Sequence, residues 1–263
     1  MLKISLSNMY FSDPLDQFHL EVLRKEGVSA IELAPFHQFH SYDDKNKLVQ
    51  FRSWLVEANI SISGIQGFTY AENANDLRNS FLSGGKLWKD HYRKILAIAE
   101  ILECKTLVFG APNFRSETKN KIRFGKAFML SANMAKVSGK DLLLEAVPKC
   151  YGSNIYNTFE EVKEFNLNNN LKTHFDTGCY INEKREQDND NFWPSAEFYH
   201  FHLSAEDLKL CAKSKSLKEY LKTFNLGSIL DGYLVLESTV KSNTLSEAVL
   251  DVSFAKKVLK NAN

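Results

Sequence analysis

Four ionisable side chains of this sequence stand at the ends of short apolar runs. They are Glu145, Asp176, His202 and Glu237, and the clearest runs are Leu142–Leu144 and Leu234–Leu236. A carboxylate at the end of a buried run is unfavourable unless its charge is compensated. Three converging carboxylates would raise each other's pKa, and a divalent cation removes that repulsion. Three carboxylates and one imidazole suit Mn²⁺ first, and also Mg²⁺, Co²⁺ or Zn²⁺.

Each carboxylate has an alternative explanation, which is an ion pair with a nearby lysine or arginine. That explanation is adequate for any one of the positions taken alone. It becomes less adequate when the same feature recurs at four successive apolar runs. We therefore predict one divalent metal ion held by Glu145, Asp176, His202 and Glu237.

The elements that must position these side chains alternate between short apolar and longer amphipathic segments. The expected strands are Leu2–Leu6, Ser29–Ala34, Ile60–Gln66, Thr106–Gly110, Asp141–Val147, Leu171–Asp176, Phe198–Leu203 and Gly232–Glu237. Helices are expected at Pro14–Gly27, Lys45–Asn59, Trp88–Glu103, Glu117–Ser138, Thr158–Asn166, Ser216–Thr223 and around Leu245–Leu259. Two stretches, Gly67–Leu87 and Asn182–Ser195, are expected to be irregular connections.

This alternation favours parallel strands joined by helical crossovers. Eight units in 263 residues suit a closed (β/α)8 TIM barrel better than an open doubly wound sheet, which is the alternative. We predict one α/β domain over residues 1–263. The functional groups of such barrels lie at the C-terminal ends of the strands, where the four candidate ligands fall.

Hydrophobic content, net charge and cysteine spacing limit the classes of protein to which this sequence can belong. Hydrophobic residues make up 44%, enough for one sizeable core, and the net charge of +1 gives no basic excess for nucleic acid. The cysteines are irregularly spaced and indicate a reducing compartment. We see no secretory leader and no apolar run of about 18 residues. The expectation is a cytoplasmic protein that binds neither nucleic acid nor membrane.

The sequence resembles the xylose isomerase-like TIM barrels, a superfamily of sugar and sugar-phosphate isomerases and epimerases that includes endonuclease IV (AP endonuclease family 2). The resembling segments are Ile4–Asn8, Ile31–Pro35, Leu107–Arg115, Leu144–Lys149, His174–Gly178, His200–Ser204 and Val235–Glu237. The gaps of 31, 26 and 35 residues between the four ligands resemble the ketose 3-epimerases. The subgroup that looks most similar is uncharacterised and is found among bacterial surface-polysaccharide genes.

Two positions depart from the family's pattern. Cys179 stands where the nucleases, and many ketose epimerases, have a histidine. Gln66 stands where the nucleases have a further histidine. The further ligands of a three-zinc site are therefore not apparent, which argues against DNA repair. The missing histidine also puts the particular ketose substrates of the epimerases in doubt.

The resemblance implies an isomerase or epimerase in which Glu145 and Glu237 both bind the metal and move the proton. We expect the metal to chelate a hydroxyl and a carbonyl of a sugar and to stabilise an enediolate. One glutamate removes the carbon-bound proton and the other returns a proton. The alternatives are a dehydratase or lyase of the inositol-pathway type, an endonuclease IV-like phosphodiesterase, and a barrel that binds ligand without catalysis.

Substrate contacts are predicted for five further residues: Gln66, Arg115, Lys149, Tyr10 and Phe68. Gln66 would bind a hydroxyl, and Arg115 or Lys149 a phosphate or carboxylate. Tyr10 and Phe68 would stack on the sugar. The alternatives are a surface ion pair for Arg115, a solvated Lys149 and packing roles for the aromatic rings. We expect a small-molecule sugar as partner. Such barrels often form homodimers, and no exposed stripe decides the oligomeric state.

Overall fold

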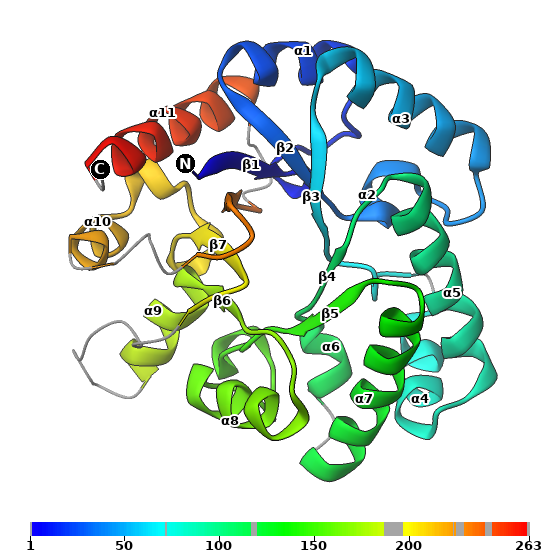
Figure 1. The fold of residues 1–263 in the computed structure, drawn as a ribbon. Coiled ribbons are helices and arrows are strands. Elements are labelled where there is room, and N and C mark those ends of the chain that lie inside the picture. Colours follow the sequence, from blue (N-terminus) through cyan, green and yellow to red (C-terminus); the bar gives the residue numbers. More distant parts are fainter. Residues whose placement is uncertain are drawn as a thin grey trace.

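Eight short strands form one parallel sheet that curves into a nearly closed barrel, with helices around the outside (Figure 1). The computed structural model describes residues 2–71, 73–116, 120–186, 197–222, 224, 229–239 and 244–261. The strands are β1 Lys3–Ser7, β2 Val28–Leu33, β3 Ser61–Ile65, β4 Thr106–Phe109, β5 Asp141–Leu144, β6 His174–Asp176, β7 His200–Ser204 and β8 Tyr233–Glu237. Their order is β5-β4-β3-β2-β1-β8-β7-β6. The predicted single-domain (β/α)8 barrel is confirmed, and the doubly wound alternative is excluded.

The outer layer consists of the crossover helices and several short turns. Its helices are α1 Gln17–Lys25, α2 Pro35–Phe39, α3 Lys45–Ala58, α4 Ala74–Ser83, α5 Lys86–Ile101, α6 Pro112–Arg115, α7 Lys121–Val137, α8 Phe159–Asn169, α9 Thr177–Glu186, α10 Lys215–Leu221 and α11 Leu245–Asn261. The 3₁₀ turns are η1 Asn8–Tyr10, η2 Lys149–Tyr151, η3 Glu206–Leu208 and η4 Cys211–Lys213. None of the described helices has the length and apolar character needed to cross a bilayer.

Helices occupy parts of both connections that were expected to be irregular. Within Gly67–Leu87, α4 buries Leu77 and Phe81 and ends at Gly84, which adopts a left-handed conformation. The prediction for Asn182–Ser195 was also wrong at residues 182–186, because these belong to α9, which follows β6 directly. The remaining residues of this connection, 187–195, lie outside the described chain.

Two helices begin later than predicted, because the residue that caps each of them lies further along the chain. The first helix begins at Gln17 because Asp16 accepts a hydrogen bond from the His19 amide. Likewise α7 begins at Lys121, where Asn120 is the cap. Residues 117–119 of the predicted helix Glu117–Ser138, and Thr223 of Ser216–Thr223, lie outside the described chain.

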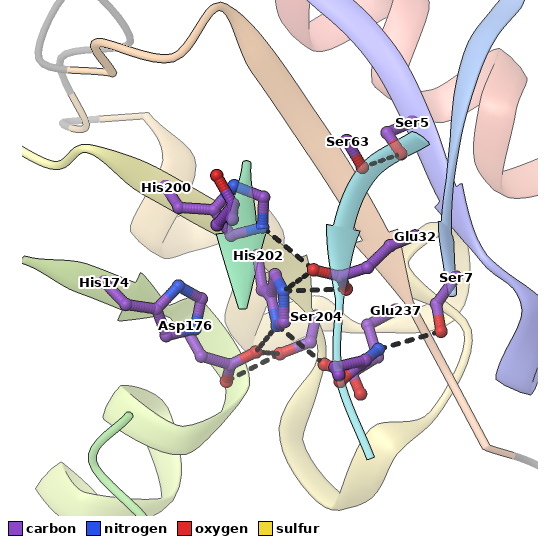
Figure 2. Close-up of polar contacts among 12 residues, drawn as sticks. Ser5, Ser7, Glu32, Ser63, His174, Asp176, His200, His202, Ser204 and Glu237 are labelled. Atoms are coloured by element: carbon purple, nitrogen blue, oxygen red, sulfur yellow. Dashed lines mark hydrogen bonds and ion pairs between the residues drawn. The ribbon is translucent and has the colours of Figure 1, made fainter. Parts of the chain in front are cut away.

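The interior of the barrel is polar on the side of β6, β7 and β8. Along β7, His200, His202 and Ser204 point inward (Figure 2). The intervening Phe201 packs outward against Phe224. Barrel interiors are more often filled by Val, Ile and Leu, and buried polar groups need partners. This alternation of polar and apolar residues therefore builds a site inside the barrel.

A buried carboxylate holds the last helix against the rest of the barrel. Asp251 on α11 accepts hydrogen bonds from the Tyr10 hydroxyl at 2.6 Å and from the amides of Cys211 at 2.8 Å and Ala212 at 2.7 Å. We expect Asp251→Ala to lower the free energy of unfolding by about 3 kcal/mol, because two buried donors and one partly buried donor lose their acceptor. Urea unfolding measures the change, and Asp90→Ala on the exposed face of α5 is the control. Equal midpoints for the two variants would contradict this role.

Candidate metal centre and substrate cavity

The four predicted ligands meet at the C-terminal end of the barrel. Glu145 directly follows β5, Asp176 and Glu237 are the last residues of β6 and β8, and His202 is the third residue of β7. Strand register places Asp176 opposite His202, and Ser204 opposite Glu237. One ligand atom from each of the four residues lies within 4.8 Å of all the others. Four segments far apart in the sequence therefore offer one cluster of donors.

The imidazole of His202 is oriented as a ligand would be. Its Nδ1 atom lies 2.9 Å from Glu237 Oε2 and 3.7 Å from Asp176 Oδ2. The nitrogen is fully buried and directed at two carboxylates, and a cation at the centre of the cluster could bind all three groups together. The donor set therefore fits a divalent metal ion.

Two carboxylates of the cluster have raised pKa values because they are buried close to other groups of the site. Burial, together with the neighbouring Glu145 and Glu237, raises the pKa of Asp176 to about 7. Burial likewise raises the pKa of Glu145. Asp176 is held in place by the Ser204 hydroxyl, which donates at 2.7 Å, and by the backbone amide of Cys179. These carboxylates are fixed close together although they repel one another, which favours cation binding.

The shifted pKa of Asp176 predicts how stability depends on pH. This pKa rises from its ordinary value of 3.8 to about 7 in the folded protein, so the folded protein holds this proton more tightly than the unfolded chain. Between these two pH values the metal-free protein is expected to lose stability as pH rises. A cation replaces the proton, so the increase in Tm caused by Mn²⁺ should grow over the same range.

Calorimetry with EDTA or with Mn²⁺, at about pH 5 and about pH 8, measures this effect. The variant Asp176→Asn is the control, because its side chain has no proton to lose and its Tm should respond little to Mn²⁺ at either pH. A Mn²⁺-induced increase in Tm of the same size at both pH values in the unmodified protein would contradict the prediction.

A cavity of about 410 Å³ opens above the cluster, and Glu145, Asp176 and Glu237 lie in its wall. Gln66, Thr69 and Thr239 add neutral polar groups, and Tyr70, Tyr151 and Leu208 add apolar surface. A few placed polar groups within an apolar wall are typical of small-molecule sites. The arrangement suits a compact small molecule that carries polar groups.

Gln66 is the one predicted substrate-binding residue that lines this cavity. Its amide donates to the Ser7 hydroxyl at 2.9 Å, which fixes its orientation. Lys149 lies on η2 with its side chain exposed, and it is not among the described residues of the cavity wall. Tyr151, on the same turn, lines the cavity instead. Sequence reasoning missed it because the direction of a side chain on a turn depends on the backbone of that turn.

Arg115 is fully buried and its guanidinium binds main-chain carbonyls rather than facing the cavity. It donates to the oxygens of Phe109 at 2.8 Å, Glu145 at 2.8 Å and Tyr156 at 3.3 Å. These bonds tie the ends of β4 and β5 to the following loop. Arg115 therefore helps to hold the backbone of Glu145 in place. It does not line the cavity, so the structure does not place it where it was predicted to bind a phosphate or carboxylate of the substrate.

Tyr10 and Phe68 are also buried away from the cavity wall. The Tyr10 hydroxyl is engaged by Asp251. Phe68 packs against Tyr92 and Phe109, with ring centroids 5.9 and 5.8 Å apart. Both rings fill space beneath the loops, which is the alternative that the sequence had left open for them.

Glu32 is a part of the site that sequence reasoning missed. It lies within β2, fully buried, and contacts both His200 and His202. Burial opposes its ionisation, but His202 and His200 lower the pKa of Glu32 well below its usual range. The sequence carried a signal, because a glutamate between Ile31 and Leu33 interrupts a buried run in the same way as the four ligands.

No family model and no curated protein matches the sequence. Solved structures share its fold. A xylose isomerase domain-containing protein from Salmonella typhimurium has a TM-score of 0.70 at 12% identity, over 99% of this chain and 97% of that one. The chain has a xylose isomerase-like TIM barrel fold. A 3-keto-D-glucoside 4-epimerase from E. coli has a TM-score of 0.65 at 13% identity, over 98% and 99% of the two chains. A zinc-bound IolI protein has a TM-score of 0.64 at 15% identity, over 100% and 99%.

Proposed function

We propose that the protein is a divalent-metal-dependent isomerase or epimerase of a sugar or sugar derivative. The observation that carries the proposal is the meeting of Glu145, Asp176, His202 and Glu237 in one cluster, whose three carboxylates line one cavity. The fold shared with a sugar epimerase supports the same reaction class. Mn²⁺ is the proposed ion, because three carboxylates and one imidazole form a predominantly hard donor set.

The four ligands would hold the ion, which when bound would polarise a carbonyl and an adjacent hydroxyl of the sugar and acidify the proton on carbon. Glu145 and Glu237 both reach the cavity, and they come from strands separated by β6 and β7. One carboxylate removes the proton to leave an enediolate. The other returns a proton to the opposite face, which epimerises the carbon, or to the neighbouring carbon, which isomerises the sugar.

The charges at the cavity favour an uncharged sugar over a sugar phosphate. Three carboxylates and one divalent cation leave a net charge of −1, which would repel a phosphate. Arg115, the cation expected to bind such a group, donates to main-chain carbonyls instead. We therefore propose a neutral sugar or polyol ketone as the substrate.

Incubating the purified protein with Mn²⁺ and a panel of free and phosphorylated sugars in D₂O tests the proposal. Deuterium at carbon, detected by NMR and lost with EDTA, is the expected result for an unphosphorylated sugar. Loss of water from a substrate would instead indicate the dehydratase alternative. Cleavage of abasic DNA would indicate the phosphodiesterase, and failure to exchange any sugar would count against the isomerase.

A further inference from the structure

The buried carboxylate of Glu32 lies on the side of His202 that faces away from the other ligands (Figure 2). The Nε2 atom of His202 is 3.0 Å from Glu32 Oε1 and 2.9 Å from Oε2. Glu32 does not belong to the four-residue ligand cluster. Since an ionised carboxylate can only accept, this contact places a ring proton of His202 on Nε2. The Nδ1 atom faces Asp176 and Glu237, and it is the nitrogen that a cation in the cluster would bind.

Glu32 is itself held by a second histidine. The Nε2 atom of His200 lies 2.9 Å from Glu32 Oε1, and the Nδ1 atom of His200 contacts the carboxylate of Asp231. Asp231 precedes β8, so it lies at the end of the barrel opposite the cavity. Glu32, His200 and Asp231 thus form a buried acid–histidine column beneath His202. Both nitrogens of His200 already face carboxylates, which makes it a support and not a free metal ligand.

The barrel leaves space for this column at Gly64. A Cβ atom at this position in β3 would lie 2.7 Å from Glu32 Oε1 and 3.3 Å from His200 Nε2. Glycine weakens the interior of a strand and often marks a close approach of another group. The lack of a side chain at Gly64 is therefore an independent indication that the barrel accommodates the Glu32 carboxylate at this position.

We propose that Glu32 is a positioning residue of the metal centre. It fixes the tautomer and ring orientation of His202 so that Nδ1 points to the cation, while His200 and Asp231 hold Glu32 in place. Carboxylates that orient a metal-bound histidine in this way contribute about 10- to 100-fold to metal affinity. The inference rests on the metal site of the proposed function, but not on the reaction or the substrate.

The test is the affinity for Mn²⁺, measured by calorimetry without any substrate, together with the visible absorption spectrum of the Co²⁺-loaded protein. We expect Glu32→Gln and Glu32→Ala to bind Mn²⁺ about 10- to 100-fold more weakly and to change the Co²⁺ spectrum. Asp231→Asn should show a smaller loss because it acts through His200. Glu183→Gln is the matched control, since it removes a buried carboxylate that accepts from the Phe159 amide outside the cluster.

A variant that unfolds is replaced by Gly64→Ala, which displaces the Glu32 carboxylate without removing any polar group. Wild-type Mn²⁺ affinity and an unchanged Co²⁺ spectrum in folded Glu32→Gln and Gly64→Ala would overturn the role of Glu32 and leave the proposed function intact. If the unmodified protein bound no Mn²⁺, both the metal site and this inference would be overturned. Normal Mn²⁺ binding without sugar exchange would count only against the reaction.

Discussion

Glu145→Gln is expected to reduce deuterium exchange into the sugar by about a thousandfold at saturating Mn²⁺, because it removes one of two groups that can move the proton. The side chain of Glu145 is only 13% exposed, and its carboxylate reaches the cavity. Glutamine keeps the shape and one oxygen donor but cannot accept the proton. The measurement is NMR of the exchange rate at Mn²⁺ concentrations that saturate the variant.

Glu183→Gln is the control for this experiment. It makes the same chemical change at a buried carboxylate on α9, which caps α8 through the Phe159 amide and does not line the cavity. The control should lose stability and keep its exchange rate. Exchange at the wild-type rate in a Glu145→Gln variant that has bound its metal would rule out Glu145 as an acid–base group.

Gly110→Ala is expected to lower kcat/KM by about a hundredfold, because small displacements of a catalytic group are costly. Gly110 follows β4, and a Cβ atom there would overlap Oε2 of Glu145. The backbone of Gly110 is not left-handed, so alanine causes no strain of its own. The added methyl group acts only by pushing the carboxylate out of the ligand cluster, and Mn²⁺ affinity should fall with activity.

Two further variants separate this effect from general damage to the core. Gly125→Ala in α7 places a methyl group against Phe165 and should leave Mn²⁺ affinity unchanged. In the Gly110→Ala background, Glu145→Asp shortens the carboxylate and should recover part of the affinity for Mn²⁺. Wild-type kcat/KM in Gly110→Ala would show that the position of Glu145 in the fold is not the one used in the reaction.

Local patterns in the sequence were sufficient to locate the strands and the four side chains that meet in the cluster. Strands β5 and β8 could be located because apolar runs precede Glu145 and Glu237, although β5 ends at Leu144 and not at the predicted Val147. In a parallel barrel all strand ends of one kind lie on the same face. A charged residue at the end of a buried run can therefore be assigned to that face, near the residues that end the other strands, before the fold is known.

The direction of a side chain in a loop, by contrast, depends on turns that the sequence does not specify. Arg115 follows β4 as a substrate-binding arginine would, yet its guanidinium turns under the strand ends to main-chain carbonyls. Tyr151 reaches the cavity and Lys149 on the same turn does not. Phe68 and Tyr10 are buried beneath loops, where their rings fill space in the core.

The barrel, the face that carries the site and the four side chains that meet there could all be derived from the amino-acid order alone. Each follows from the succession of apolar and charged residues along a strand. The support of His202 by Glu32, and the room that Gly64 and Gly110 leave for carboxylates, became visible only in the folded chain. Those relations join residues of different strands, and they depend on distances across the barrel that no local pattern contains.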